Sequence, residues 1–68
     1  MKIMVVAISG SKIALGCDNG TIAIYSYDKK GYLCEFEGHS REITGLTWVS
    51  ASTLVSVSDD NSIGFWRI

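Results

Sequence analysis

Residues 54–66 read LVSVSDDNSIGFW, and this stretch decides the fold class of the 68-residue chain. Runs rich in Val, Ile, Ser and aromatic residues flank the polar cluster Asp59-Asp60-Asn61. Two such runs around a turn signal predict two antiparallel strands joined by a tight turn. The same composition continues outward, with a turn signal about every ten residues and no apolar residues at helical spacing. We therefore expect an all-β chain of short antiparallel strands.

Seven strands are expected, each bounded by Gly, Asn, Asp or Ser turn signals. They are Ile3–Ser9, Lys12–Cys17, Thr21–Tyr27, Tyr32–Glu37, Ile43–Val49, Thr53–Ser58 and Ser62–Ile68. Asn19-Gly20 marks the clearest hairpin, because both residue types tolerate a positive φ. Residues 38–42 are expected to form a loop between the fourth and fifth strands.

The first and fourth strands differ in how apolar their two faces are. The first strand is apolar on both faces from Ile3 to Ile8. The fourth strand alternates, with Tyr32, Cys34 and Phe36 on one face and glutamates on the other. This difference predicts sheets that stack face to face around an axis, with the first strand covered on both sides.

An internal repeat supports this arrangement. A shift of 41 residues places Asp18 on Asp59 and Tyr25 on Trp66, with strands and turns in phase and no gap. A period of this length is typical of the four-stranded blades of a β-propeller. The repeat therefore predicts two successive units of the same kind.

The second unit resembles a WD40 repeat. Gly38-His39 stands where that family has its Gly-His pair, and Ile43-x-x-Leu46-x-Trp48 is similar to its innermost strand. Residues 54–66 are similar to its second strand, tight turn and third strand, and Trp66-Arg67 replaces the terminal Trp-Asp. The resemblance is strong over residues 38–68 and weak before them, where Tyr25-Ser26 stands in the place of Trp-Asp. It implies two antiparallel propeller blades.

The resemblance also implies a structural tetrad of hydrogen-bonded side chains. His39 would lie between Asp60 and Ser56, and Ser56 would reach Trp66. A buried imidazole needs partners for both ring nitrogens, and this set supplies an acceptor, a hydroxyl and an indole N–H. The first blade should lack the network, because Leu15, Asn19 and Tyr25 stand at the matching positions.

Other roles for His39 are disfavoured by the surrounding sequence. His39, Asp60 and Ser56 are the residue types of a hydrolase triad, but Ser56 lies mid-strand without a nucleophile elbow. A zinc site would need Cys-x-x-Cys or His-x-x-x-His spacing, which Cys17, Cys34 and His39 do not provide. We therefore expect no catalytic residue, no metal and no cofactor, and two reduced thiols.

Charge and hydropathy exclude two classes of partner. Six Lys and Arg nearly balance seven Asp and Glu, which leaves a net charge of −1 and no basic field for nucleic acid. The longest uncharged run covers residues 43–58 and carries seven Ser or Thr, so it is too short and too polar to span a membrane. We expect an intracellular protein, cytoplasmic or nuclear.

The size of the chain predicts assembly. Residues 1–37 would form a divergent four-stranded blade, and residues 38–68 a three-stranded blade without its outermost strand. A chain of this length buries only about 60% of its unfolded surface, and repeat units need about three neighbours for stability. The expected partners are therefore proteins or further blades, either copies of this chain or parts of a larger one.

The leading functional hypothesis is a non-enzymatic scaffold for protein interactions. Stacked sheets would hold the tight turns and the loops before the inner strands on one rim, where side chains can contact a partner. The candidate contact residues are Arg41, Glu42 and Asp59, with Asp18 as the counterpart of Asp59 in the first blade.

Two alternatives remain at this point. The chain could be a structural propeller subunit or fragment that assembles with itself or with a larger complex. Residues 45–48, 52–55 and the Asp59-Asp60 turn are also similar to the final repeat of the actin-interacting protein 1 family. That similarity implies an actin-regulatory propeller fragment, which binding of the full-length parent to actin filaments would test.

Overall fold

Seven strands form two antiparallel sheets in the computed structural model, which describes residues 2–28 and 31–68. The strands are β1 (Ile3–Ser9), β2 (Lys12–Cys17), β3 (Thr21–Ser26), β4 (Gly31–Glu37), β5 (Ile43–Trp48), β6 (Thr53–Ser58) and β7 (Ile63–Arg67). The first sheet has the order β1-β2-β3-β4 and the second the order β5-β6-β7. The predicted all-β fold is confirmed, and no strand end differs from its predicted position by more than one residue.

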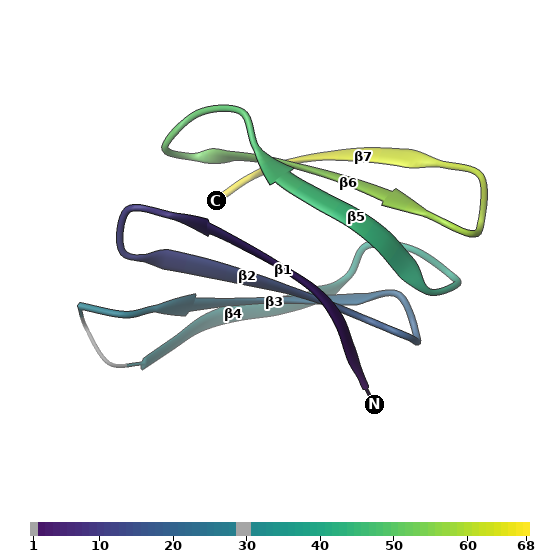
Figure 1. Cartoon of the computed structure of the whole chain (residues 1–68), viewed down its shortest axis with the longest axis horizontal. Coiled ribbons are helices and arrows are strands. Elements are labelled where there is room, and N and C mark those ends of the chain that lie inside the picture. The colour runs from purple at the N-terminus through teal and green to yellow at the C-terminus, as the bar shows by residue number, and fades with distance from the viewer. Residues whose placement is uncertain (1, 29–30) are drawn as a thin grey trace.

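The core lies between the two sheets, which face each other as layers (Figure 1). Fully buried side chains come from both layers: Ala14, Ile22 and Ile24 from the first sheet, and Ile43 and Leu54 from the second. Removal of this apolar surface from water is the main force that holds the sheets together. Strands β1 and β5 make the closest connection between the layers.

Only one face of β1 is covered, which corrects the prediction that both would be. Val5 and Ala7 face the second sheet and pack against the core. Val6 and Ile8 point the other way and are 53% and 67% exposed. Both faces of β1 are apolar, as the sequence indicates, but nothing in the described chain lies against this second face.

The predicted face of Tyr32 is also wrong, because β4 contains a bulge. Ile24 pairs with Cys34, but the next residue, Tyr25, pairs with Tyr32, so Leu33 is the extra residue. An inserted residue reverses the alternation of side chains beyond it. Tyr32 therefore lies edge-on against Tyr25, with ring centroids 5.7 Å apart, on the face away from the core.

The two sheets repeat the same pairing pattern with one offset that the sequence shift missed. A bulge separates Ile3 from Val5 in the first sheet, and a matching bulge separates Ile43 from Gly45 in the second. These innermost strands therefore correspond at 40 residues, whereas β2 and β6 correspond at 41. The difference arises because residues 50–52 form a turn that is one residue longer than Gly10-Ser11.

The tight turns after β2 and β6 are built alike. The Gly20 amide donates to Cys17 O, and the Asn61 amide donates to Ser58 O. Gly20 has a φ of +90° and Asn61 a φ of +68°. Of the Asn19-Gly20 pair, only the glycine adopts positive φ, and the Asn19 side chain instead accepts a hydrogen bond from the Thr21 amide.

Candidate functional site

Three connecting segments meet at one rim of the two-layer structure. They are the turn 18–20, the loop 38–42 and the turn 59–61, and all three lie at the right-hand end of the ribbon in Figure 1. They meet because every strand that leads into them runs in the same direction, since antiparallel pairing alternates turns between two rims. All eight predicted site residues belong to this rim or to the strands directly beneath it.

Gly20 seats the loop 38–42 on the first sheet. The amides of Gly38 and His39 both donate to Gly20 O, at 3.1 Å each. A side chain at Gly20 would collide with the backbone, because its Cβ would lie 2.0 Å from His39 O. A glycine is therefore required here both for its φ and for the close approach of the two segments.

A chain of hydrogen bonds runs from Trp66 to Asp60 through the second sheet. The Trp66 indole N–H donates to Ser56 Oγ at 2.8 Å, and Ser56 Oγ lies 2.6 Å from His39 Nε2. On the other side of the ring, His39 Nδ1 lies 3.2 Å from Asp60 Oδ2. Ser56 is fully buried and His39 nearly so.

The partners of His39 can satisfy both of its ring nitrogens. Because Ser56 Oγ already accepts the indole N–H, its own hydroxyl proton is free to be donated to His39 Nε2. On the other side of the ring, an Nδ1 N–H can be donated to Asp60. Every buried side-chain nitrogen and oxygen in the described part of the chain has a hydrogen-bond partner.

Asp60 holds the loop and the turn together as a charged acceptor. It accepts from the Ser62 hydroxyl and from the Ser40 amide, the latter at 3.0 Å, and from the Ser62 amide at 2.9 Å. These hydrogen bonds, with the Ser62 hydroxyl first, hold the pKa of the Asp60 carboxyl well below its ordinary value. Asp60 is therefore an ionised anchor rather than a proton donor.

Two serines take part that the sequence reading did not single out. The Ser62 hydroxyl lies 2.8 Å from His39 Nδ1, beside Asp60. The Ser58 hydroxyl donates to Glu42 O at 2.8 Å and accepts from the Asp60 amide. A serine two positions before or after an Asp in a turn favours such local bonds, but this signal is too common to identify these two among many serines.

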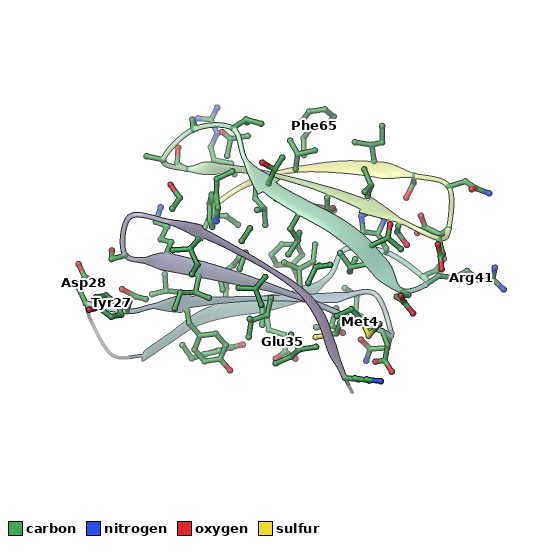
Figure 2. All side chains as sticks on the ribbon, in the orientation of Figure 1. Met4, Tyr27, Asp28, Glu35, Arg41 and Phe65 are labelled. Atoms are coloured by element: carbon green, nitrogen blue, oxygen red, sulfur yellow. The ribbon has the colours of Figure 1, made fainter. Side chains whose placement is uncertain are left out.

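The four candidate contact residues lie on this rim with fixed backbones. The Asp59 amide donates to Glu42 O, which joins their two segments. Arg41 is exposed, and its side chain extends away from both sheets (Figure 2). Asp18 is exposed as well, but its carboxylate accepts from the Lys2 amide at 2.9 Å and is thereby partly engaged.

The first sheet has no counterpart of this network among its described residues. Leu15 replaces the serine, and Tyr25 replaces the tryptophan and is 38% exposed. Asn19 reproduces only one hydrogen bond of Asp60, because its side-chain oxygen accepts from the amide two residues later.

A groove lies beside the free edge of the second sheet. It has a volume of about 650 Å³ and runs between β4 and β7, lined by Leu33, Cys34, Phe36, Trp66 and Ile68 among others. In the first sheet, the matching strand β3 pairs with β4, whereas β7 pairs only with β6 among the described strands.

The described residues include histidine, cysteine and carboxylate side chains, which are the types that bind metal ions. No group of three or more His, Cys, Asp or Glu side chains within them is placed to hold a metal ion. Cys17 and Cys34 are free thiols, and burial raises the pKa of the Cys17 thiol, with the charges of Asp18 and Glu35 adding to the effect. Among the described residues, no helix is long and apolar enough to cross a membrane.

The chain is similar in sequence to known proteins over most of its length. No family model matches the chain. It is 36% identical over 63 residues to Protein SPA1-RELATED 3 of Arabidopsis thaliana and 39% identical over 57 residues to Topless-related protein 3 of the same plant. It is also 28% identical over 60 residues to the Retinoblastoma-binding protein 5 homolog of Drosophila melanogaster. These matches cover 88%, 82% and 87% of the chain.

Solved structures agree with the sequence relatives. The computationally designed Ika8 and Ika4 proteins superpose on 97% of the chain, with TM-scores of 0.90 and 0.89 and 27% identity. This chain is part of a WD40-repeat propeller. Its two sheets are WD40 blades, and WD40 repeats are generally non-catalytic.

The WD40 portion is small beside its relatives. It spans 5–12% of the length of the three relatives, 20% of the Ika8 chain and 41% of the Ika4 chain.

Proposed function

We propose that this chain is a non-enzymatic scaffold that presents the rim of its WD40 blades to a protein partner. One observation carries the proposal: hydrogen bonds hold the backbone of the rim, while the Arg41 and Asp59 side chains stay exposed. The loop 38–42 is bonded to Gly20 on one side and to Asp60 and Ser58 on the other. Arg41, near the end of that loop, is exposed and can contact another molecule.

The charges on the rim suggest the chemistry of the partner. Arg41 is followed by Glu42, and the loop that carries both lies between the turns that carry Asp18 and Asp59 (Figure 1). Its guanidinium can make a two-pronged contact with a carboxylate, and the acidic side chains can accept from Lys or Arg. A protein segment with an acidic residue flanked by basic ones would match this pattern.

Rigidity matters because a fixed loop loses little entropy when it binds. Ordering a flexible loop at an interface costs about 0.5–1.5 kcal/mol for each immobilised side chain, in addition to the backbone. The bonds from Gly20, Asp60 and Ser58 remove most of the backbone part before any partner arrives. The network beneath the rim therefore serves recognition through preorganisation.

The test is capture of partner proteins by the parent protein that carries these blades. Arg41→Glu reverses the charge at the centre of the rim and leaves the network intact, because only the backbone of Arg41 is bonded within it. We expect loss of captured partners, identified by mass spectrometry. Arg67→Glu, on β7 away from the rim, is the matched control. Equal recovery with all three proteins would remove Arg41 and the rim from the proposed function.

A further inference from the structure

The exposed turn after β2 carries the dipeptide Asn19-Gly20, whose side-chain amide and main-chain nitrogen can react with each other. The amide of an asparagine can be attacked by the nitrogen of the next residue, and glycine leaves that nitrogen unobstructed because it has no Cβ. Asparagine is among the thermolabile residues of proteins. Asn19 lies on the surface of the rim, exposed to the water that such a reaction consumes. This turn is therefore a candidate site of spontaneous chemical modification.

A hydrogen bond keeps the two reacting groups of this turn together. Asn19 Oδ1 accepts from the Thr21 amide at 3.1 Å, which closes an Asx-turn over the Asn19-Gly20 peptide bond. The closed ring keeps the side-chain carbonyl carbon, Cγ, on the side of the Gly20 nitrogen. The Thr21 N–H also stabilises the negative charge that develops on Oδ1 when Cγ is attacked. The fold thus supplies both proximity and an oxyanion donor at one amide.

The Gly20 nitrogen is held by a single long hydrogen bond. Its N–H donates to Cys17 O at 3.2 Å, which is the upper end of the usual range for such bonds. The N–H bond lies in the plane of the peptide, whereas the nitrogen electrons that attack Cγ lie above and below that plane. The contact with Cys17 therefore leaves the attacking side of the nitrogen open.

The second asparagine of the chain, Asn61, is placed differently in the turn after β6. The next nitrogen belongs to Ser62, and its N–H donates to Asp60 Oδ1 at 2.9 Å. The Ser62 side chain adds a Cβ beside that nitrogen, and its hydroxyl donates to Asp60 as well. This nitrogen is therefore bonded more tightly, and obstructed more, than the nitrogen of Gly20. Asn61 provides an internal reference within the same molecule.

We propose that Asn19 is a site of spontaneous deamidation and that its isoaspartate product releases the loop 38–42 from Gly20. This proposal goes beyond the rim function above, because the reaction needs water and no partner protein. In the first step hydroxide removes the Gly20 amide proton, and the nitrogen forms a bond to Asn19 Cγ. The side-chain nitrogen then leaves with a proton from water, as ammonia, and hydroxide is regenerated. The product is a succinimide ring.

Water opens the succinimide at either of its two carbonyl groups. Addition at Cγ breaks the bond from Cγ to the Gly20 nitrogen and leaves an aspartate in an ordinary main chain. Addition at the main-chain carbonyl of Asn19 breaks the original peptide bond, so that the chain continues through Cγ as isoaspartate. The isoaspartate chain is longer by one carbon–carbon bond, about 1.5 Å.

The contact between Gly20 and the loop 38–42 is too close for a longer chain. Gly20 O accepts from the Gly38 and His39 amides at 3.1 Å each, so both hydrogen bonds depend on the position of one carbonyl. A Cβ on Gly20 would collide with His39 O, which shows how closely the two segments approach. An extra bond directly before Gly20 displaces its carbonyl, and both amides then lose their acceptor. Deamidation at Asn19 therefore loosens the rim.

Ageing of the folded parent protein in mildly alkaline buffer tests the proposal. Cleavage after Lys and Arg places the two asparagines in separate peptides, residues 13–29 and 42–67, so mass spectrometry follows each conversion independently. Isoaspartate is distinguished from aspartate by methyl transfer from S-adenosylmethionine, catalysed by an isoaspartyl methyltransferase. Asn19→Asp is the matched control, because it has the charge of the aspartate product and an ordinary main chain.

The expected outcome has two parts. Asn19 should convert at least about tenfold faster than Asn61, because misplacement of reacting groups lowers a rate by that order or more. Aged protein that carries isoaspartate should lose the hydrogen-exchange protection of the Gly38 and His39 amides, whereas Asn19→Asp should keep it. Equal conversion of the two asparagines would overturn the proposal. Isoaspartate without loss of that protection would overturn it as well, as would equal loss in Asn19→Asp.

Discussion

At the residue scale, His39 joins the rim to the sheet beneath it. Its ring connects Asp60 in the turn to Ser56 and Trp66 in the strands, and its backbone is bonded to Gly20 in the first sheet. It also meets Trp66 edge-on, with ring centroids 6.2 Å apart. One residue thus links the turn 18–20 in the first sheet to β6, the turn 59–61 and β7 in the second.

Replacing His39 by Ala should therefore destabilise the fold. The change leaves the buried Ser56 hydroxyl without its acceptor, and a buried polar group without a partner costs about 1–3 kcal/mol. Urea denaturation of the folded protein should show a loss of that size in the free energy of unfolding. Asp59→Ala, at an exposed neighbouring position, should change it by less than about 0.5 kcal/mol. Equal stability of the two variants would mean that the network contributes nothing.

Asp60 should make the protein sensitive to acid. Its pKa is lowered in the folded state from an ordinary value of 3.8, first by the Ser62 hydroxyl and the Ser40 amide. As the pH falls below that value, the unfolded chain takes up a proton that the folded chain does not, so stability falls.

The Asp60→Asn variant isolates this contribution from the other carboxyl groups. The stability advantage of the unmodified protein over the variant should shrink progressively below about pH 4. Thermal melting at a series of pH values measures it. An advantage that does not change with pH would show that Asp60 has the same pKa in both states.

At the element scale, the tight turns and their partner loop determine how the two sheets fit. Turn signals place all seven strands to within one residue, because Gly, Asn and Asp interrupt runs of β-forming residues so regularly. The sequence does not reveal the bulge at Leu33, because a bulge is a property of strand pairing. Apolar and charged residues alternate around Leu33 in the sequence much as they would in a regular strand.

The candidate site could be predicted in a similarly uneven way. His39, Ser56, Asp60 and Trp66 are found from the resemblance, because their spacing fits one family pattern. Gly20 is visible only as a turn residue. Its role as a seat for the loop 38–42 depends on the packing of one blade on the next, which local sequence does not encode.

Two glycines with positive φ provide a matched test of this seat. At Gly10 φ is +58°, and nothing lies within 4 Å of the position that a Cβ would take. Gly10→Ala should therefore lower the free energy of unfolding by about 1–2 kcal/mol, from backbone strain alone. Gly20→Ala should lower the free energy of unfolding by clearly more, because the new Cβ also collides with His39 O. Chemical denaturation of both variants measures the difference, and equal losses would contradict the close contact.

The free edge of β7 should also be detectable. Strand β3 is paired on both sides, by β2 and β4, whereas β7 is paired only with β6 among the described strands. Hydrogen exchange followed by nuclear magnetic resonance should therefore find the amides on alternate residues of β7 exchanging much faster than any amide of β3. Uniform protection along β7 would mean that another strand covers this edge in solution.

At the scale of the whole molecule, two blades share one core and hold one rim. The core residues come from both sheets, so neither blade is complete without the other. The same packing positions the loop 38–42, because its seat lies in the first blade and its anchor, Asp60, in the second. We therefore expect this rim to be rigid before any partner binds.

Exchange of the Ser40 amide proton measures the rigidity of the rim. Ser40 lies on the surface, and its amide should be protected only because it donates to Asp60 Oδ2 at 3.0 Å. We predict exchange at least about tenfold slower than in an unstructured chain, which corresponds to roughly 1.4 kcal/mol of protection, and loss of that protection in Asp60→Ala. Exchange at the unstructured rate in the unmodified protein would contradict a preformed rim.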